Sequence, residues 1–159
     1  MSSSIERHAK LLKAAASAAR SITTILDSYE LFQRTVDIIC DEFGFYYAGV
    51  FLVEGDYAIL KAGRGEAGRA MLREGHKLAI GGNSMIGASI ANKKGRIALD
   101  VGAEAVFFEN PHLPKTRSEM ALPLIINDEA IGALTVQSTE EAAFHEEDID
   151  ALQTMADQL

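Results

Sequence analysis

Apolar residues near the N-terminus repeat with the spacing of a helix that pairs with another helix. The repeat runs from residue 5 to residue 26 in alternating steps of three and four, and its alanines would let a partner helix approach closely. The seam consists of Ile5, His8, Leu12, Ala15, Ala19, Ile22 and Leu26. A second helix is predicted before Gly44, because apolar residues follow there at helical spacing and the glycine ends the run.

Beyond Gly44 the apolar residues form short, nearly continuous runs, which are typical of strands covered on both faces. The runs 46–53 and 57–63 flank a glycine-containing turn and predict a hairpin. A second hairpin is predicted for 117–126 and 130–138. The pattern therefore changes from helices to strands a quarter of the way along the chain.

The remaining segments predict small elements on either side of one long loop. The small elements are expected at 66–74, 76–80, 83–94 and 96–101, and a last helix begins near His145. Residues 102–116 lack a regular pattern, and loops of that length in compact domains are often functional. Pro123 cannot donate to a strand ladder, so we expect a bulge or an unpaired position there. The order predicts an α+β domain with the terminal helices on one sheet face and the small helices and the loop on the other.

Composition and charge narrow the function classes. The 159 residues suffice for one domain with a buried core, and the net charge is −8. The last 20 residues carry seven acids and no Lys or Arg, so the rest of the chain is near −1 and lacks the basic stripe of a nucleic-acid surface. No apolar run approaches the roughly 20 residues of a membrane helix, and the N-terminus lacks the apolar core of a signal peptide. We therefore expect a cytoplasmic protein.

Three segments near the C-terminus resemble the motifs of a GAF domain. They are NPHLPKTRSEMALPL at 110–124, IGALTVQS at 131–138 and FHEEDIDALQTMADQL at 144–159. With the element order, the resemblance covers about residues 20–159 and is greatest to GAF domains of bacterial sensor histidine kinases and related signalling proteins, which suggests a two-component system. It implies a PAS-related fold: a six-stranded antiparallel sheet with a ligand pocket on the face opposite the terminal helices.

The resemblance also implies an organisation for signalling. Residues 1–27 would be a dimerisation and signalling helix, 28–144 the GAF core, and 145–159 a helix leading toward an output domain. We expect a homodimer whose contact combines the N-terminal seam with the last helix. The expected contact residues are Ile5, Leu12, Ala15, Ala19, Ile22, Leu26, Ile149 and Leu152.

The loop and the strand that follows it are the expected lid and doorway of the pocket. Adjacent aromatic residues in the loop suit either a lid over an apolar ligand or an anchor for the loop itself. Arg117 could hold an anionic ligand group, or it could tie the loop to neighbouring backbone. Polar groups in the strand 130–138 need partners if they are buried, and a ligand is one candidate. The predicted ligand-binding residues are Tyr47, Phe51, Phe107, Phe108, His112, Arg117, Ser118, Met120, Thr135 and Gln137.

Alternation along the strand 117–126 leaves the orientation of its two faces open. Ser118 and Met120 lie on one face, and Arg117 and Glu119 lie on the other. The sequence does not say which face meets the pocket.

Cofactor chemistry has little support in the sequence. The lone Cys40 excludes a disulfide framework and a Cys-rich metal site, and its helical position argues against the covalent bilin of some GAF relatives. It also argues against the chemistry of the free methionine sulfoxide reductases, which share the fold and need several cysteines. Some GAF sensors bind haem through a histidine, and His76 or His112 would be the ligand here. We see no catalytic motif and expect no enzyme.

Three functions remain as hypotheses. The first is a sensory domain that binds an unidentified small molecule under the loop 102–116 and relays the signal through dimeric terminal helices. The second is a spacer without a ligand, whose pocket is filled by Phe107, Phe108 and Met120. The third is a haem-binding gas or redox sensor.

Overall fold

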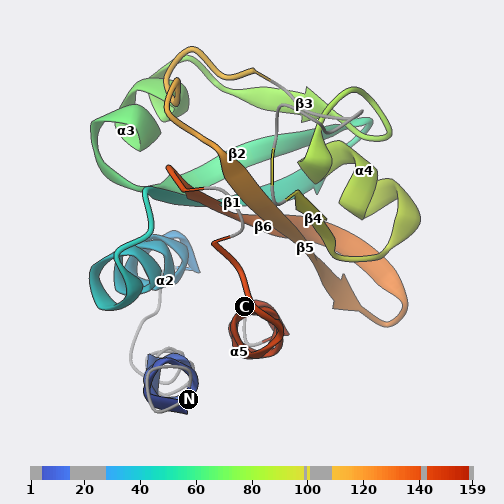
Figure 1. Ribbon diagram of the computed structural model, residues 1–159. Coiled ribbons are helices and arrows are strands. Elements are labelled where there is room, and N and C mark those ends of the chain that lie inside the picture. Colours follow the sequence, from blue (N-terminus) through green and yellow to red (C-terminus); the bar gives the residue numbers. More distant parts are fainter. Residues whose placement is uncertain (1–4, 15–27, 99, 101–108, 141–142, 158–159) are drawn as a thin grey trace.

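The computed structural model describes residues 5–14, 28–98, 100, 109–140 and 143–157. The strands are β1 (Tyr47–Glu54), β2 (Tyr57–Gly63), β3 (Lys77–Ala79), β4 (Arg96–Ala98), β5 (Ser118–Ile126) and β6 (Glu129–Ser138). The helices are α2 (Ser28–Phe43), α3 (Gly65–Arg73), α4 (Met85–Asn92) and α5 (Glu146–Asp157), with a further helical segment at residues 5–14. The strands form one antiparallel sheet in the order β3-β2-β1-β6-β5-β4 (Figure 1), which confirms the predicted α+β fold.

Two hairpins build the centre of the sheet. Asn127 and Asp128 link β5 to β6, and both have positive φ, 51° and 65°, as a two-residue turn between twisted strands requires. Gly55 has a φ of 62° in the turn between β1 and β2. Both predicted hairpins are therefore confirmed, and β1 joins them by pairing with β6.

The register of the second hairpin shifts part of the way along it. Next to the turn, Ile125 pairs with Ala130, but Leu124 pairs with Gly132, so β6 uses one residue more than β5. This bulge, which takes up Ile131, determines which residues of the two strands share a face. The shift lies beside Leu124 rather than at Pro123, where a bulge was one of the two expectations.

Pro123 itself is paired with a partner strand on one side only. It is opposite Ala133 of β6. On its other side, β4 pairs with β5 only from Glu119 to Ala121. Among the described residues, β5 therefore has no partner strand on the β4 side at the proline, as is typical of prolines within strands.

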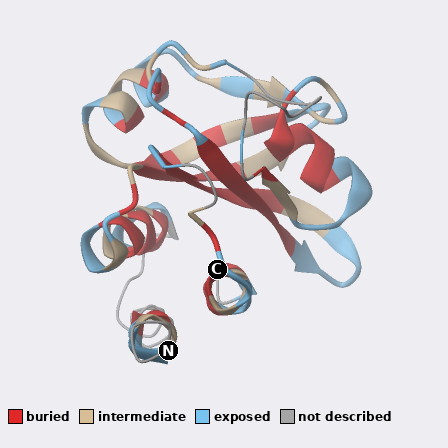
Figure 2. Ribbon diagram, viewed as in Figure 1, coloured by how far each residue is buried: buried red, intermediate tan, exposed pale blue. Residues whose placement is uncertain are grey.

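The sheet separates two apolar clusters, as the buried strands and the helices on either side of them show in Figure 2. On one face, α2, α5 and the 5–14 helix pack on Val50, Leu122, Leu134 and alternating neighbours. On the other face, α3, α4 and the segment 109–116 cover Tyr47, Phe51 and their neighbours. Both faces are covered, which explains the nearly continuous apolar runs of the central strands.

The first helix packs on the domain through a different stripe from the predicted seam. Leu11 and Ala14 are buried, whereas the seam residues Ile5 and Leu12 are 71% and 46% exposed and face outward. Ala15, Ala19, Ile22 and Leu26 lie outside the described residues.

The last helix is fixed by a buried aspartate. One oxygen of Asp148 accepts a hydrogen bond from the backbone N–H of His145 at 3.0 Å, and the other accepts one from Arg7 Nε at 2.6 Å. Arg7 also lies over the ring of Phe45, 5.0 Å from its centroid. Asp148 thus caps α5 and connects it to the first helix.

The expected dimer contact of the last helix needs a correction. Leu152 is fully buried within its own chain, and Ile149 packs against the same core. The helix uses its apolar stripe to cover its own sheet, so Leu152 is not part of a surface that a second copy could reach.

Candidate functional site

A pocket lies on the sheet face opposite the terminal helices, beneath the segment 109–116 that crosses the sheet near α3 (Figure 1). Strands β1, β5 and β6 form its floor, and α3, the start of α4 and the segment 109–116 form its walls. Its cavity volume is about 30 Å³. That is enough for about two water molecules and far below a drug-sized site. The lining residues are Tyr47, Phe51, Met71, His76, Leu78, Ser84, Met85, Ile86, Asn110, Leu113, Glu119, Thr135 and Gln137.

A buried polar network lies on the floor of this pocket. Thr135 Oγ1 donates a hydrogen bond of 2.6 Å to Glu119 Oε2, and Gln137 Nε2 donates to the same oxygen at 3.3 Å. Gln137 Nε2 also lies 3.2 Å from Thr135 Oγ1, and Thr116 Oγ1 donates to Gln137 Oε1 at 2.7 Å. The strand register brings these groups together, because Glu119 and Tyr47 both pair with Gln137, one on each side of it.

Glu119 is an acid without a counter-ion. It is 6% exposed, and none of the described residues that line the pocket is a lysine or an arginine. Burial raises the pKa of its carboxyl from 4.5 to about 7, and the hydrogen bond from Thr135 opposes that rise only in part. Both of these hydrogen bonds end on Oε2, and no described residue donates to Oε1. The second oxygen is therefore open to a ligand.

Tyr47 contributes a second unsatisfied group. Its ring lines the pocket at 2% exposure, and its hydroxyl has no hydrogen-bond partner among the described residues. Glycine at positions 49 and 63 makes room for it, because a Cβ would lie 2.8 Å from the hydroxyl oxygen at Gly49 and 2.5 Å from it at Gly63. Burial raises the pKa of Tyr47, so the hydroxyl stays protonated.

The segment 109–116 is attached to α3 by two contacts. Asn110 Nδ2 lies 3.0 Å from Met71 Sδ, and His112 Nε2 lies 2.9 Å from Glu74 Oε2 just after the helix. Leu113 fills the apolar cluster below. This segment closes the pocket through one buried anchor and an outer pair, of which Glu74 is well exposed.

A comparison with protein-family models finds one match that covers most of the chain. The model described as "GAF domain" matches residues 26–159. The chain belongs to the GAF domain family. Among the curated proteins compared with it, none matches.

Solved structures share the fold of this GAF domain at low sequence identity. The GAF domain of a phosphoenolpyruvate-protein phosphotransferase from Coxiella burnetii superposes with a TM-score of 0.84 at 17% identity, covering 94% of this chain and 90% of that one. A free methionine-R-sulfoxide reductase from Neisseria meningitidis, in complex with its substrate, gives 0.82 at 20% identity, with 96% and 87% covered. The nlh2 GAF domain of A. aeolicus in an inactive state gives 0.77 at 13%, with 94% and 92% covered. These structures show that a sulfoxide reductase shares the fold with GAF domains of other proteins.

Four of the predicted ligand-binding residues line the pocket of the GAF domain: Tyr47, Phe51, Thr135 and Gln137. His112 lies in the closing segment and points its Nε2 toward Glu74 rather than lining the pocket. Phe107 and Phe108 lie outside the described residues.

Three predicted ligand-binding residues lie elsewhere. Met120 is buried under the terminal helices, because its strand face is the one that packs on α2 and α5. Ser118 shares that face and donates to the backbone oxygen of Glu140 at 2.6 Å. Arg117 is exposed, and its backbone N–H donates to Ser138 at the end of the sheet. No arginine among the described lining residues could therefore bind an anionic ligand group.

Glu119, at the centre of the site, was not among the ligand-binding residues predicted from the sequence. Alternation already placed Glu119 on the face opposite Met120, and the polar residues Thr135 and Gln137 marked the neighbouring strand. The position of the turn alone does not show that Glu119, Thr135 and Gln137 lie on one face of the sheet. Counting back from Asn127-Asp128 without a bulge would put Met120 opposite Thr135, whereas the observed shift puts Ala121 there.

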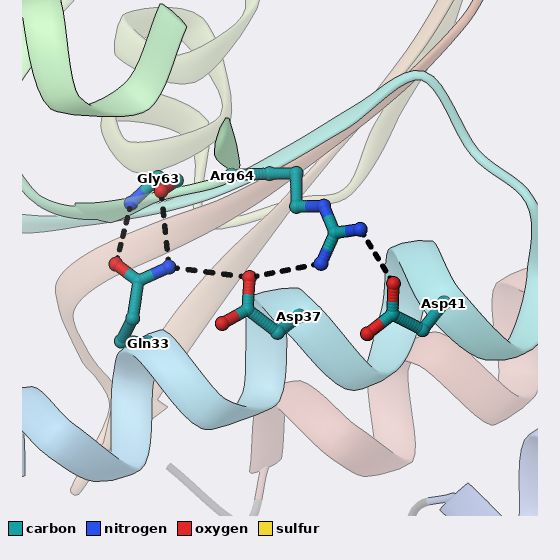
Figure 3. Close-up of polar contacts among 5 residues, drawn as sticks. All are labelled: Gln33, Asp37, Asp41, Gly63 and Arg64. Carbon is teal, nitrogen blue, oxygen red and sulfur yellow. Dashed lines mark hydrogen bonds and ion pairs between the residues drawn. The ribbon is translucent and has the colours of Figure 1, made fainter. Parts of the chain in front are cut away.

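A second polar cluster, shown in Figure 3, lies between α2 and the end of β2, outside the pocket. Arg64 Nη1 and Nη2 lie 3.2 Å from Asp37 Oδ1 and 2.5 Å from Asp41 Oδ1. Gln33 Nε2 donates to the backbone oxygen of Gly63 at 3.0 Å and to Asp37 at 3.3 Å. The cation and the two acids are at least one-third exposed and mutually paired. This cluster connects α2 to the end of β2, and because its charges are paired and exposed we assign it no ligand.

Cysteine and histidine chemistry is poorly placed. Cys40 is buried on the helix-covered face, and desolvation raises the pKa of its thiol to about 12, so it stays protonated and unreactive. His76 lines the pocket against Phe51, with ring centroids 5.9 Å apart, and burial lowers its pKa.

No cluster of metal ligands is found among the described residues. None of the described helices is both long and apolar enough to cross a bilayer.

Proposed function

We propose that this GAF domain is a sensory, non-enzymatic module that binds a small molecule between the sheet and the segment 102–116. The observation that carries the proposal is the floor of the pocket, where Glu119 is buried without a cation and Tyr47 without a hydrogen-bond partner among the described residues. Buried polar groups in native proteins are normally satisfied. Groups left unsatisfied in a cavity are typical of a binding site.

The sheet provides the connection between ligand and output. Glu119 faces the pocket, and its neighbour Met120 packs under the terminal helices, so a shift of β5 acts on both layers. A ligand that prefers one arrangement of this strand would bias the helices above Met120. The Arg7–Asp148 pair would move the first and last helices together.

The proposed relay includes a homodimer formed through the first helix. Support comes from Ile5 and Leu12, which are seven residues apart and exposed on the side away from the domain. We expect sedimentation at micromolar concentration to show a dimer and the double change Ile5→Glu and Leu12→Glu to give a folded monomer. Leu72→Glu, an exposed leucine on α3, is the matched control. A monomeric wild-type protein would contradict this part of the proposal.

We also propose a division of the chain into segments like those of GAF domains in signalling proteins. Residues 1–27 would act as the dimerisation and signalling segment, 28–144 as the core, and 145–159 as the link to an output domain in a cytoplasmic two-component or histidine kinase protein. Support comes from Asp148, which connects the first and last helices at the point where signals would enter or leave.

Native mass spectrometry of the protein purified from its own host tests ligand binding. We expect a co-purifying molecule that is lost in a variant with a filled pocket, such as Thr135→Leu. Leu72→Ala on the surface of α3 is the control and should retain the molecule. A wild-type protein that carries nothing, and whose melting temperature responds to no metabolite, would overturn the proposal.

A ligand-free spacer is the second candidate, and the size of the pocket favours it. About 30 Å³ of room means that Met71, Met85 and Leu113 already fill most of the space under the closing segment. In that case the free and metabolite-treated proteins would give the same hydrogen-exchange pattern. The same small volume argues against haem, although His76 lines the pocket. Haem addition without a Soret band would dispose of that alternative.

A further inference from the structure

We infer that the pocket selects a small organic cation, an ammonium group on a short apolar body, with the ammonium against Glu119. This inference rests on the proposed function, because it names the chemical class of the ligand for that same site. Four features of the pocket lead to it, namely its charge, an oxygen of Glu119 without a donor among the described residues, its aromatic wall and its size.

The charge of the pocket is the first feature. Glu119 is the one carboxyl group among the described lining residues, and neither a lysine nor an arginine is present among them. The only nitrogen base in that lining is His76, and burial disfavours its charged form. A buried carboxylate is costly unless a cation pairs with it. A ligand ammonium would supply that cation, whereas an anionic ligand would add to the cost.

The free oxygen of Glu119 is the second part of this argument. Thr135 and Gln137 both donate to Oε2, so the network holds the carboxyl group in place from one side. No described residue donates to Oε1, although the side chain is 6% exposed. This oxygen can accept a hydrogen bond from a group in the pocket, and an ammonium group offers the charge-assisted form of that bond.

The walls suit the rest of such a ligand. Tyr47 and Phe51 present aromatic rings, and a cation near an aromatic face is stabilised further. Met71, Met85 and Leu113 give an apolar surface for a short chain. The room of about 30 Å³ limits the part that enters to a few heavy atoms unless the segment 109–116 moves.

The test uses three probes of nearly equal shape: n-propylamine, 1-propanol and propionate. Binding to the 159-residue chain is followed by amide chemical shifts of the pocket strands at about pH 8, where the amine is protonated and the carboxyl group of Glu119 is mostly ionised. We expect the amine to bind roughly tenfold or more tightly than the alcohol, and propionate not to bind.

The variant Glu119→Gln removes the charge and keeps an oxygen for Thr135 and Gln137. We expect its preference for the amine over the alcohol to fall to about twofold, with affinity for the alcohol unchanged. Asp37→Asn removes a carboxylate outside the pocket and should keep the wild-type preference. If Glu119→Gln retained the full preference for the amine, the inference would be overturned.

A pH series on the wild-type protein gives the same information if Glu119→Gln fails to fold. Affinity for the amine should fall as the pH drops below about 7 and Glu119 takes up a proton, while affinity for the alcohol should not change. The other titratable groups near the pocket are Tyr47 on β1, His76 before β3 and the Glu74–His112 pair at its edge. A protonated His76 would also repel the amine, but burial lowers its pKa from 6.5, so a loss of preference that begins near pH 7 reports Glu119.

The outcomes separate this inference from the proposed function. Equal binding of amine and alcohol would overturn selection for a cation and leave a small-molecule pocket standing. Preference for propionate would overturn it in the same way. If none of the three probes shifts the pocket resonances, the inference is wrong, and native mass spectrometry still decides whether the pocket takes another ligand.

Discussion

The two faces of the central strands differ in what they bury. On the helix-covered face, Val50, Leu122 and Leu134 meet α2 and α5 in an apolar layer. On the pocket face, Glu119 and Thr135 lie among apolar residues, and the layer leaves a small cavity. The same strands supply both, because alternate residues point to opposite sides. The comparison shows how one sheet can combine a stable face with a face whose groups remain available to a ligand.

The largest expected effect tests the apolar layer. Leu134→Ala should lower the free energy of unfolding by about 2–5 kcal/mol, because the residue is fully buried and its removal leaves a cavity between the sheet and the helices. Urea denaturation followed by circular dichroism measures the change. Leu72→Ala, on the surface of α3, should cost far less. Equal effects for the two leucines would contradict the comparison.

The pocket face should show itself in the pH dependence of stability. The pKa of Glu119 is about 7 in the folded chain and about 4.5 when unfolded, so the folded state binds more protons between these values. Stability from the protonated carboxyl group is therefore present below about pH 4.5 and lost as the pH rises to about 7, by about 3 kcal/mol. Urea denaturation across this range should show the loss in the wild type and a flatter curve in Glu119→Gln. A wild-type curve without this fall would rule out a buried acid.

The Arg7–Asp148 pair tests how the helix-covered face is held at its edge. Arg7→Met keeps the apolar stem and leaves fully buried Asp148 without its cation, so we expect a loss of about 1–3 kcal/mol. Hydrogen exchange should speed up in the 5–14 helix and in the first turn of α5 together. Arg69→Met removes an exposed ion pair on α3 and serves as the control. Unchanged exchange at the start of α5 would show that the two helices are not coupled through this pair.

The smallest effect should have the opposite sign. Tyr47→Phe removes a buried hydroxyl that has no hydrogen-bond partner among the described residues, so we expect a gain of about 1 kcal/mol. Thermal denaturation without added ligand measures it. Tyr57→Phe, at an exposed tyrosine, should leave stability unchanged. A loss of stability in Tyr47→Phe would mean that the hydroxyl is satisfied in solution.

Most of the fold could be predicted from the sequence, whereas the orientation of the pocket could not. Helical and strand spacings, the glycine turn and the pair Asn127-Asp128 identified the hairpins and the helix at each end. The bulge that takes up Ile131 left no comparable signal, and it decides that Glu119 rather than Met120 lies beside Thr135. A shift of one residue exchanges the two faces of a strand, so the sequence left the pocket face of 117–126 open and the prediction included Ser118 and Met120 from the opposite face.

The first helix shows a similar limit. Its apolar residues serve two surfaces, since Leu11 and Ala14 face the domain and Ile5 and Leu12 face outward. Heptad spacing identified the outward set and passed over the inward one, because periodicity alone does not tell which stripe meets the domain. Burial of Leu152 inside the domain also depends on tertiary packing that no local pattern reveals.

Pro123 has a consequence for the behaviour of this protein at high concentration. Beyond Ala121, strand β5 has no neighbour on the β4 side, and its end carries Ile125 and Ile126, which are 38% and 52% exposed. An open edge with apolar side chains is a template on which another chain can add a strand and begin to aggregate. Pro123 lies two residues before Ile125 on this edge, and a proline on an edge strand is one of the features by which native sheets discourage pairing with another chain.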